Sequence, residues 1–204
     1  MADIEKNLKE IFSEISAGND RGEKIALLGA TKFVPTEKIN EAVAAGLEYI
    51  GENHAQEFRD KFAFYPPCEK HFIGTLQKNK LKYVVGKADV IDSVSNAEIA
   101  EAINEKAATL GIVQSVMLEI NAGDEKTKTG SSIDTAKALY KSIINLNHLK
   151  LIGIMAMLPA GKTDDELAYL CEKVRDFYEE IRLSSPDVKT LSMGMSGDYK
   201  TAIK

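Results

Sequence analysis

The sequence predicts an α/β protein built as a (β/α)8 TIM-type barrel, with an extra N-terminal helix and with the last strand absent. Short apolar runs alternate with amphipathic helical patterns from end to end, and this alternation is typical of parallel sheets. No G-x-G-x-x-G follows the first apolar run, which weakens the competing doubly wound dinucleotide-binding fold. The helix ahead of the first strand and the even series of units favour the barrel.

The first half of the chain predicts an initial helix and then four strands that alternate with further helices. The first helical face carries Ile4, Leu8, Ile11, Phe12 and Ile15. The apolar runs that predict strands cover 25–31, 47–51, 71–74 and 89–94. Gly18 is expected to end the first helix, and Thr36 to cap a second helix that ends at Gly46. Ser95 and Glu98 are expected to form a capping box.

The second half predicts three more strand and helix units. The strands are expected at 115–120, 151–155 and 190–194. Helical spacing is carried first by Ile133, Ala136, Tyr140 and Ile143, and later by Leu167, Leu170, Cys171, Val174, Phe177, Tyr178 and Ile181. Thr163 and Glu166 form a second expected capping box. The count is seven strands where a barrel needs eight, so we expect an open edge between the first and the seventh, which is a liability.

Length and composition predict a single domain over residues 1–204. The chain has 204 residues, 44% of them hydrophobic, and no linker-like segment divides it. Its net charge of -5 comes from 26 basic and 31 acidic residues that are interspersed, so neither nucleic acid nor an acidic membrane is an expected partner. No run approaches the ~18 apolar residues of a membrane span.

Cysteine and histidine usage points to a cytoplasmic protein without a metal. Cys68 and Cys171 form no C-x-x-C pair, and the first residues lack the order of a signal peptide. A reducing cytoplasm therefore fits. His54, His71 and His148 lack metal-ligand spacing, so no metal site is expected.

The residues that follow the strands are the candidate site, because barrel active sites lie at the carboxyl ends of the strands. These residues are Lys32, Gly51-Glu52-Asn53, Gly74-Thr75, Asn121, Met155-Ala156-Met157 and Gly194-Met195-Ser196. Lys32 is either a solvated lysine, which is the ordinary case for its position, or a positioned amine able to form a Schiff base.

Three further segments have both a structural and a functional interpretation. Asn53 is an N-cap with Gln56 at N3, or it faces the pocket and hydrogen-bonds a ligand oxygen. Ser196 caps a helix, or its turn presents a hydroxyl and backbone N–H groups to an anion. Lys126 and Lys128, after the fifth strand, are solvated, or one of them serves as a second amine or as a counter-charge to an anionic ligand.

Taken together, the motifs resemble the pyridoxal 5'-phosphate (PLP) homeostasis proteins, an alanine-racemase-like barrel family. The matching residues occur in family order over nearly the whole chain: Thr31-Lys32 and Pro35; Gly51-Glu52-Asn53 with Gln56-Glu57; 71–74 with Leu76-Gln77 and Asn79-Lys80; Glu125, Lys128 and Gly130; 153–156; 192–196 with Asp198; and Ala202-Ile203. As an ordered set they are highly specific.

The resemblance implies a barrel that holds PLP as a Schiff base. Lys32 matches the Schiff-base lysine, and Asn53 matches a pocket residue near the cofactor. Ser196 matches the hydroxyl at the phosphate, and its neighbour Met195 is also expected to bind the cofactor. Met155 and Met157 are expected beside the ring. Lys128 is expected near its phenolic edge.

Two departures from the family pattern are evident. Lys70 and Thr75 stand where the family usually has Trp and His. The Gly-Ser-Thr phosphate turn and the last strand, roughly Val-Arg-Ile-Gly, are not present, so the sequence is compatible with a truncated version of a longer protein.

The resemblance favours a protein that buffers or delivers PLP over an enzyme. Alanine-racemase-type catalysis needs a second acid–base group, a tyrosine from a partner domain, and this chain has no second domain. The alternatives are a PLP-dependent racemase-like enzyme of low activity and a Schiff-base aldolase without PLP, which the ordered motifs disfavour. Transient contact with PLP-dependent apoenzymes is an allowed interaction, and a lone barrel predicts a monomer.

Overall fold

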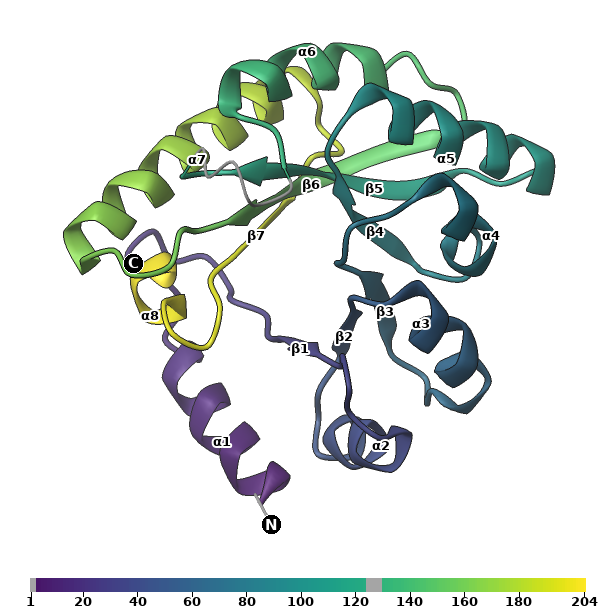
Figure 1. Cartoon of the computed structure of the whole chain (residues 1–204). Coiled ribbons are helices and arrows are strands. Elements are labelled where there is room, and N and C mark those ends of the chain that lie inside the picture. Colours follow the sequence, from purple (N-terminus) through teal and green to yellow (C-terminus); the bar gives the residue numbers. More distant parts are fainter. Residues whose placement is uncertain (1–2, 124–129) are drawn as a thin grey trace.

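Seven parallel strands form one curled sheet in the computed structural model, which describes residues 3–123 and 130–204. The strands follow one another in the sheet in chain order (Figure 1). They are β1 (Leu28–Ala30), β2 (Tyr49–Glu52), β3 (Glu69–Phe72), β4 (Val90–Val94), β5 (Gln114–Asn121), β6 (Leu149–Met157) and β7 (Thr190–Met193). The seven strands and the barrel-type curl confirm the predicted fold class.

Helices cover the convex side of this sheet and alternate with its strands (Figure 1). They are α1 (Ile4–Ile15), α2 (Thr36–Ala44), α3 (Ala55–Lys61), α4 (Leu81–Val84), α5 (Ala97–Leu110), α6 (Ile133–Ile143), α7 (Asp164–Ser184) and α8 (Tyr199–Ile203), with 3-10 turns η1 (Phe62–Phe64) and η2 (Lys78–Lys80). The extra N-terminal helix is therefore confirmed as α1. The short helix α4 was not expected from the sequence.

Strand alternation separates two apolar layers. The outer layer lies between sheet and helices and includes Phe58, Phe72, Ile103, Ile154 and Phe177. The inner layer is a small cluster of Val90, Met117 and Met155, with Ile152 and Met157 packed against it. Neighbouring residues of one strand point to opposite faces, so side chains of the inner layer share the concave face of the sheet.

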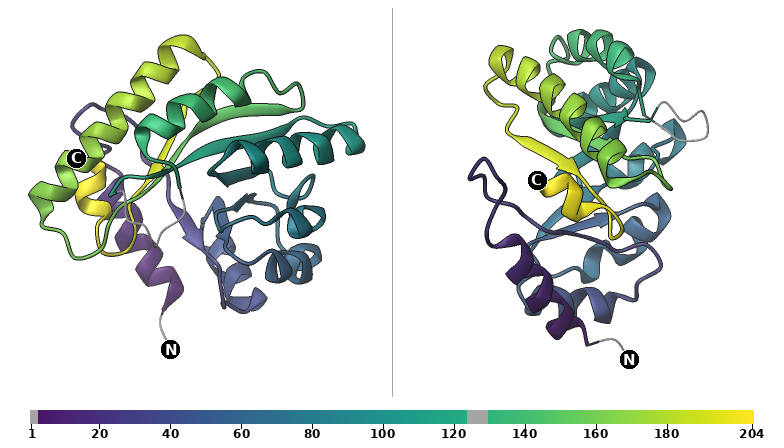
Figure 2. Two further views of the ribbon diagram at one scale, coloured as in Figure 1. Left: turned by 45° about the horizontal axis from the view of Figure 1, so that its top comes forward. Right: turned by 90° about the vertical axis from the view of Figure 1, so that its left-hand side faces the viewer.

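Side chains join the two ends of the sheet. Within the described residues β1 pairs only with β2 and β7 only with β6. Arg175 of α7 makes two hydrogen bonds, 2.7 and 2.6 Å, to the Glu23 carboxylate in the segment before β1. This guanidinium lowers the pKa of Glu23 to about 2. Tyr199 and Lys200 of α8 both bond to Glu14 of α1, and the two helices lie side by side (Figure 2).

The helix caps show where local patterns determine the structure. The capping box of Thr163 and Glu166 is confirmed. The box expected at Ser95 is wrong, because Asn96 caps α5 by accepting the Ile99 N–H at 2.9 Å. Asparagine is at least as good an N-cap as serine, so the helix starts one residue later.

The cap expected at Thr36 is also wrong. Pro35 takes the cap position of α2, and its carbonyl accepts the N–H groups of Lys38 and Ile39. Thr36 becomes the first helical residue, and no side chain caps this helix.

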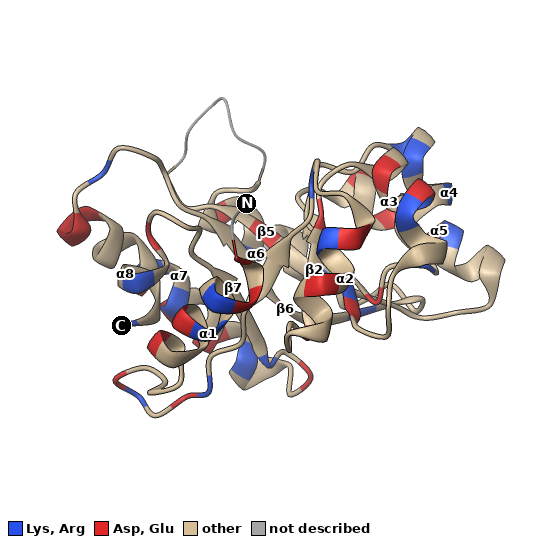
Figure 3. Ribbon diagram, turned by 90° about the horizontal axis from the view of Figure 1, so that it is seen from below, with Lys and Arg blue, Asp and Glu red and all other residues tan. Residues whose placement is uncertain are grey.

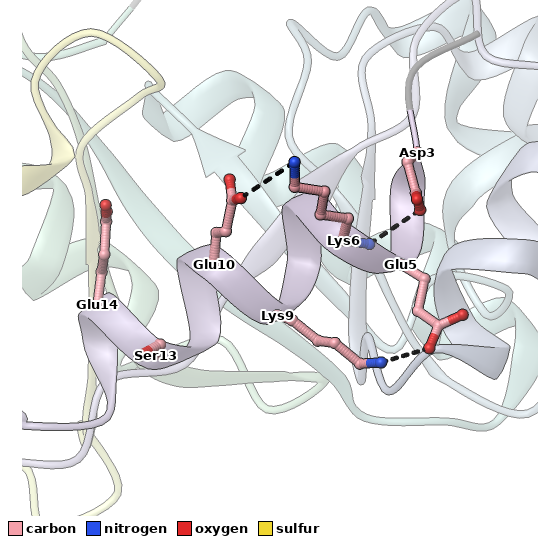
Figure 4. Close-up of a pocket in the computed structure, with 7 residues that line it drawn as sticks. All are labelled: Asp3, Glu5, Lys6, Lys9, Glu10, Ser13 and Glu14. Carbon is pink, nitrogen blue, oxygen red and sulfur yellow. Dashed lines mark hydrogen bonds and ion pairs between the residues drawn. The ribbon is translucent and has the colours of Figure 1, made fainter.

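The charged surface is mixed rather than patterned. Lys and Arg alternate with Asp and Glu along the helices that face the viewer in Figure 3. On α1, Lys9 pairs with Glu5 and Lys6 lies 3.9 Å from Glu10, beside a shallow hollow lined by this helix alone (Figure 4).

Among the described residues, no helix combines the length and the apolar character needed to span a membrane. Both cysteines are free thiols.

Replacement of Phe58 tests the outer core. The ring is fully buried and lies near the rings of Phe62, Tyr65 and Phe72. Phe58→Ala should lower the free energy of unfolding by about 3–5 kcal/mol, because it loses apolar burial and leaves a cavity. Phe64, 66% exposed, gives the control Phe64→Ala, with an expected change within about 0.5 kcal/mol. Urea unfolding that finds the two variants equally stable would contradict the assigned core.

Candidate functional site at the carboxyl ends of the strands

The predicted site residues follow strands whose carboxyl ends lie at one rim of the curled sheet. Gly29 packs against Leu47 of the helix-facing layer, and Thr31 points the same way because it bonds Glu52. Alternation therefore assigns Lys32 to the concave face. Its side chain is exposed, in a turn just beyond β1.

Glu52 is the polar centre beneath this rim. Its carboxylate is almost fully buried, at 1% exposure. Oε1 accepts the backbone N–H groups of Asn53 and His54 at 2.8 and 3.1 Å. Oε2 accepts the Thr31 hydroxyl and the Lys61 ammonium, both at 3.2 Å. One carboxylate therefore fixes the turns after β1 and β2 relative to each other.

Lys61 and Glu57 of α3 extend this network to both neighbours of Lys32. The Lys61 ammonium donates to the Thr31 carbonyl at 3.1 Å and to Glu57 at 2.6 Å. The same Glu57 oxygen accepts the Phe33 N–H at 3.0 Å. Burial acts to raise the pKa of Glu57, but the Lys61 ammonium and the Phe33 amide lower it. Lys32 is thus held between two residues whose backbone is anchored.

Asn53 does not cap α3, and that prediction is wrong. The helix begins at Ala55, with His54 in the cap position and no side-chain cap. The Asn53 side chain is instead free of the helix, and its Oδ1 is buried without a hydrogen-bond partner. Its carbonyl lies so close to Gly74 that a Cβ there would be 1.9 Å from the oxygen, so only glycine fits after β3. A buried acceptor without a partner is costly, and a ligand donor would satisfy it.

Met155 and Met157 lie on β6 and belong to the inner apolar cluster. Met155 is buried, Met157 is partly buried, and Met117 of β5 is packed into the same cluster. These flexible, polarisable side chains form a soft apolar wall on the concave face.

Ser196 lies in an exposed turn and does not cap α8. The helix starts at Tyr199, its cap position is Asp198, and no side chain caps it. The Asp198 carboxylate accepts the Met195 N–H instead. Gly194 has φ +91, a conformation that glycine adopts without strain. Met195 is 46% exposed, so it lines the rim rather than the core.

Two residues of the expected site, Lys126 and Lys128, fall outside the described residues. A second hollow lies between the start of α6 and α7, and neither it nor the hollow along α1 contains Lys32. Within the described residues, no cluster of histidine, cysteine, aspartate or glutamate could hold a metal ion.

A buried histidine–aspartate pair lies within the sheet, below the rim. His71 Nδ1 is 2.8 Å from Asp92 Oδ1, and both residues are buried. Nε2 lies 3.3 Å from Glu69, and the ring edge meets Tyr49. Burial acts to lower the pKa of His71, but the Asp92 and Glu69 carboxylates raise it. Burial also raises the pKa of Asp92.

Sequence reasoning missed the Glu52 network and the His71–Asp92 pair. Part of the first has a sequence signal, because Glu57 and Lys61 have the i,i+4 spacing of a helical ion pair. In the sequence, Glu52 is only a polar residue at the end of a strand. The structure shows that Thr31 and Lys61 both donate hydrogen bonds to its carboxylate. The second pair joins neighbouring strands 21 residues apart in sequence.

The fold and the rim residues define a barrel of the alanine racemase type. The family model described as alanine racemase, N-terminal domain, matches residues 30–203. Lys32, the inner methionines and the Ser196 turn all fall within that match.

Curated relatives show to which family of such barrels the chain belongs. A pyridoxal phosphate homeostasis protein from Aquifex aeolicus is 38% identical over 188 residues, which cover 90% of this chain and 82% of the relative. One from Pasteurella multocida is 35% identical over 215 residues, with 98% and 91% covered. The chain therefore belongs to the pyridoxal phosphate homeostasis protein family.

A solved structure supports the same assignment. PipY of Synechococcus elongatus, determined with PLP bound, superposes with a TM-score of 0.84 at 28% identity. The match covers 98% of this chain and 93% of PipY.

Replacement of Glu52 tests the anchor beneath the rim. Glu52→Gln keeps the shape of the side chain but removes the negative charge that faces Lys61. It also replaces one accepting oxygen by an NH2 group, which cannot accept the hydrogen bonds that this oxygen received. Loss of one partner of a buried ion pair should lower the free energy of unfolding by about 3 kcal/mol. Exposed Glu48 provides the matched control Glu48→Gln, expected to change stability by less than about 0.5 kcal/mol. Equal unfolding midpoints in urea would refute the anchoring role.

The His71–Asp92 pair predicts a pH dependence of stability. A histidine whose pKa is raised by folding stabilises the protein below its unfolded pKa, and this contribution is lost as pH rises through the folded value. The free energy of unfolding should therefore fall as pH rises above about 6.5. Asp92→Asn removes the larger of the two carboxylate effects that raise the His71 pKa and leaves Glu69 alone to oppose burial, so the fall in stability over this range should become shallower. An unchanged slope in urea titrations of Asp92→Asn would contradict the assignment.

Proposed function

We propose that this chain binds PLP covalently through Lys32 and acts in PLP homeostasis by buffering or delivering the cofactor. The observation that carries the proposal is the anchoring of both neighbours of Lys32, Thr31 and Phe33, to the buried network of Glu52, Lys61 and Glu57. A lysine that is merely solvated does not require neighbours fixed by buried hydrogen bonds and ion pairs. The names of its relatives and the PLP-bound PipY structure point to the same ligand.

The rim residues fit the chemistry of PLP. When bound, PLP supplies an electrophilic aldehyde, an aromatic ring and a phosphate. In this proposal Lys32 holds the aldehyde carbon as a Schiff base, and the unpaired Oδ1 of Asn53 accepts a hydrogen bond from the ligand. Met155 and Met157 supply an apolar wall for the ring.

The phosphate is assigned to the turn after β7. The Ser196 hydroxyl is exposed there, and the Met195 amide is already bonded to Asp198. The proposal therefore assigns the phosphate to the hydroxyl and the remaining amides of this turn, with Met195 at its edge, while Lys128 stays assigned to the phenolic edge of the ring.

We further propose that the protein is not an efficient enzyme. Racemisation needs a second acid–base group opposite Lys32. Tyr49 begins β2 at the far end of the sheet, and Tyr199 is bonded to Glu14. Tyr65 is near the helix-facing Glu52 and Thr31, and burial raises its pKa. None of these placements favours a second base, and the curated relatives are named as homeostasis proteins rather than enzymes.

The proposal extends to the wider setting of the chain. Residues 1–204 act as one monomeric cofactor-binding domain in the cytoplasm, and PLP passes to apoenzymes through transient contact. The exposed rim around Lys32 supports direct transfer, since a recipient protein can reach it.

Replacement of Lys32 tests the covalent link. Wild-type protein mixed with PLP should become yellow and keep one PLP per chain after borohydride reduction, because reduction converts the Schiff base to a stable amine. Lys32→Ala should lose the visible band and the mass increment. Lys82→Ala removes an exposed lysine away from the strand ends and should match the wild type. A wild-type protein that stays colourless with PLP would overturn the proposed function.

An amino-acid assay separates the carrier from the racemase-like alternative. Incubation of the PLP-loaded protein with alanine in deuterated water should give no α-deuterium incorporation at enzyme-like rates. Sustained incorporation that Lys32→Ala abolishes would instead support an enzyme.

A further inference from the structure

The turn that carries Lys32 contains an unusual backbone conformation. Phe33 has φ +60 and is the one non-glycine residue with positive φ among residues 3–123 and 130–204. This left-handed region is unfavourable for a bulky side chain, so the surroundings must hold the residue there. Strain of this kind is concentrated at functional sites.

Burial does not compensate for the strain at Phe33. Its side chain is 76% exposed. The ring instead lies against His54, with centroids 5.0 Å apart and planes inclined by 40°. The Phe33 amide is separately held by Glu57 at 3.0 Å.

This ring contact joins the two turns of the proposed site, the one after β1 and the one after β2. Phe33 follows Lys32 directly, and His54 follows Asn53, the residue with the buried unpaired Oδ1. Glu52 and Lys61 join the same two turns from beneath. The Phe33–His54 contact therefore closes the junction on its solvent side.

We propose that Phe33 is a positioning residue, which through its contact with His54 holds the Lys32 turn against the Asn53 turn and slows the release of PLP. The inference rests on the proposed function, because the ligand retained is the one that Lys32 binds. Opening of the contact would free the turn after β1 at the rim, where PLP would leave. An exposed two-ring contact is weak enough to open readily, which suits a protein that must also give up its ligand.

A set of variants separates the ring from the backbone conformation. Phe33→Gly removes the ring while glycine adopts φ +60 without strain. Phe33→Ala removes the ring and keeps the strain, Phe33→Tyr keeps an aromatic contact, and Phe64→Ala removes an exposed phenylalanine elsewhere. His54→Ala removes the partner ring.

The first readout uses protein without PLP. Hydrogen exchange of peptides covering residues 31–34 and 53–54 should be faster in Phe33→Gly, Phe33→Ala and His54→Ala than in the wild type. Phe33→Tyr and Phe64→Ala should match the wild type. Unchanged exchange in both Phe33→Gly and Phe33→Ala would overturn the proposal.

The second readout is the release of PLP on dilution. Loss of an aromatic pair should speed release roughly three- to tenfold in Phe33→Gly, Phe33→Ala and His54→Ala. The double variant Phe33→Ala/His54→Ala should be no faster than the singles, because both remove one contact. Wild-type release in Phe33→Gly, or additive effects in the double variant, would overturn the positioning role alone. A wild-type protein that takes up no PLP would overturn both this role and the proposed function.

Discussion

The buried Glu52 carboxylate is the interaction on which the candidate site depends. A charge at 1% exposure is tolerable only when its oxygens are satisfied, and here two backbone amides, a hydroxyl and an ammonium satisfy them. Those donors come from the turn after β1, the turn after β2 and helix α3. The electrostatic requirement of one side chain therefore fixes the relative position of the two turns that carry Lys32 and Asn53.

The curled sheet determines on which face this network lies. Thr31 and Glu52 face the helices on the convex side, so the residue that follows each of them, Lys32 or Asn53, alternates to the concave side. The anchoring side chains thus lie on one face, and the residues proposed to contact PLP lie on the other. Side-chain bridges from Arg175 to Glu23 and from α8 to Glu14 join the two ends of the sheet and so hold the segments that precede β1.

The sequence predicted the fold class, the seven strands and the rim residues, because apolar periodicity and parallel topology are local or general properties. It predicted the capping box at Thr163 for the same reason. It misplaced the caps at Ser95, Thr36 and Asn53, where a neighbouring residue competes for the same position. The contact of Glu52 with Thr31 and the bond that holds the left-handed Phe33 to Glu57 depend on tertiary packing between segments 20 or more residues apart, which no local pattern encodes.

The most direct test of the account is to map the lysine that PLP modifies. The protein is loaded with PLP, reduced with borohydride and digested, and the modified peptides are identified by mass spectrometry. If the anchored turn makes Lys32 distinct from the other exposed amines, the modification should fall on Lys32 alone at one PLP per chain. Modification spread over exposed lysines such as Lys24 and Lys82, with Lys32 no more reactive than they are, would contradict the account.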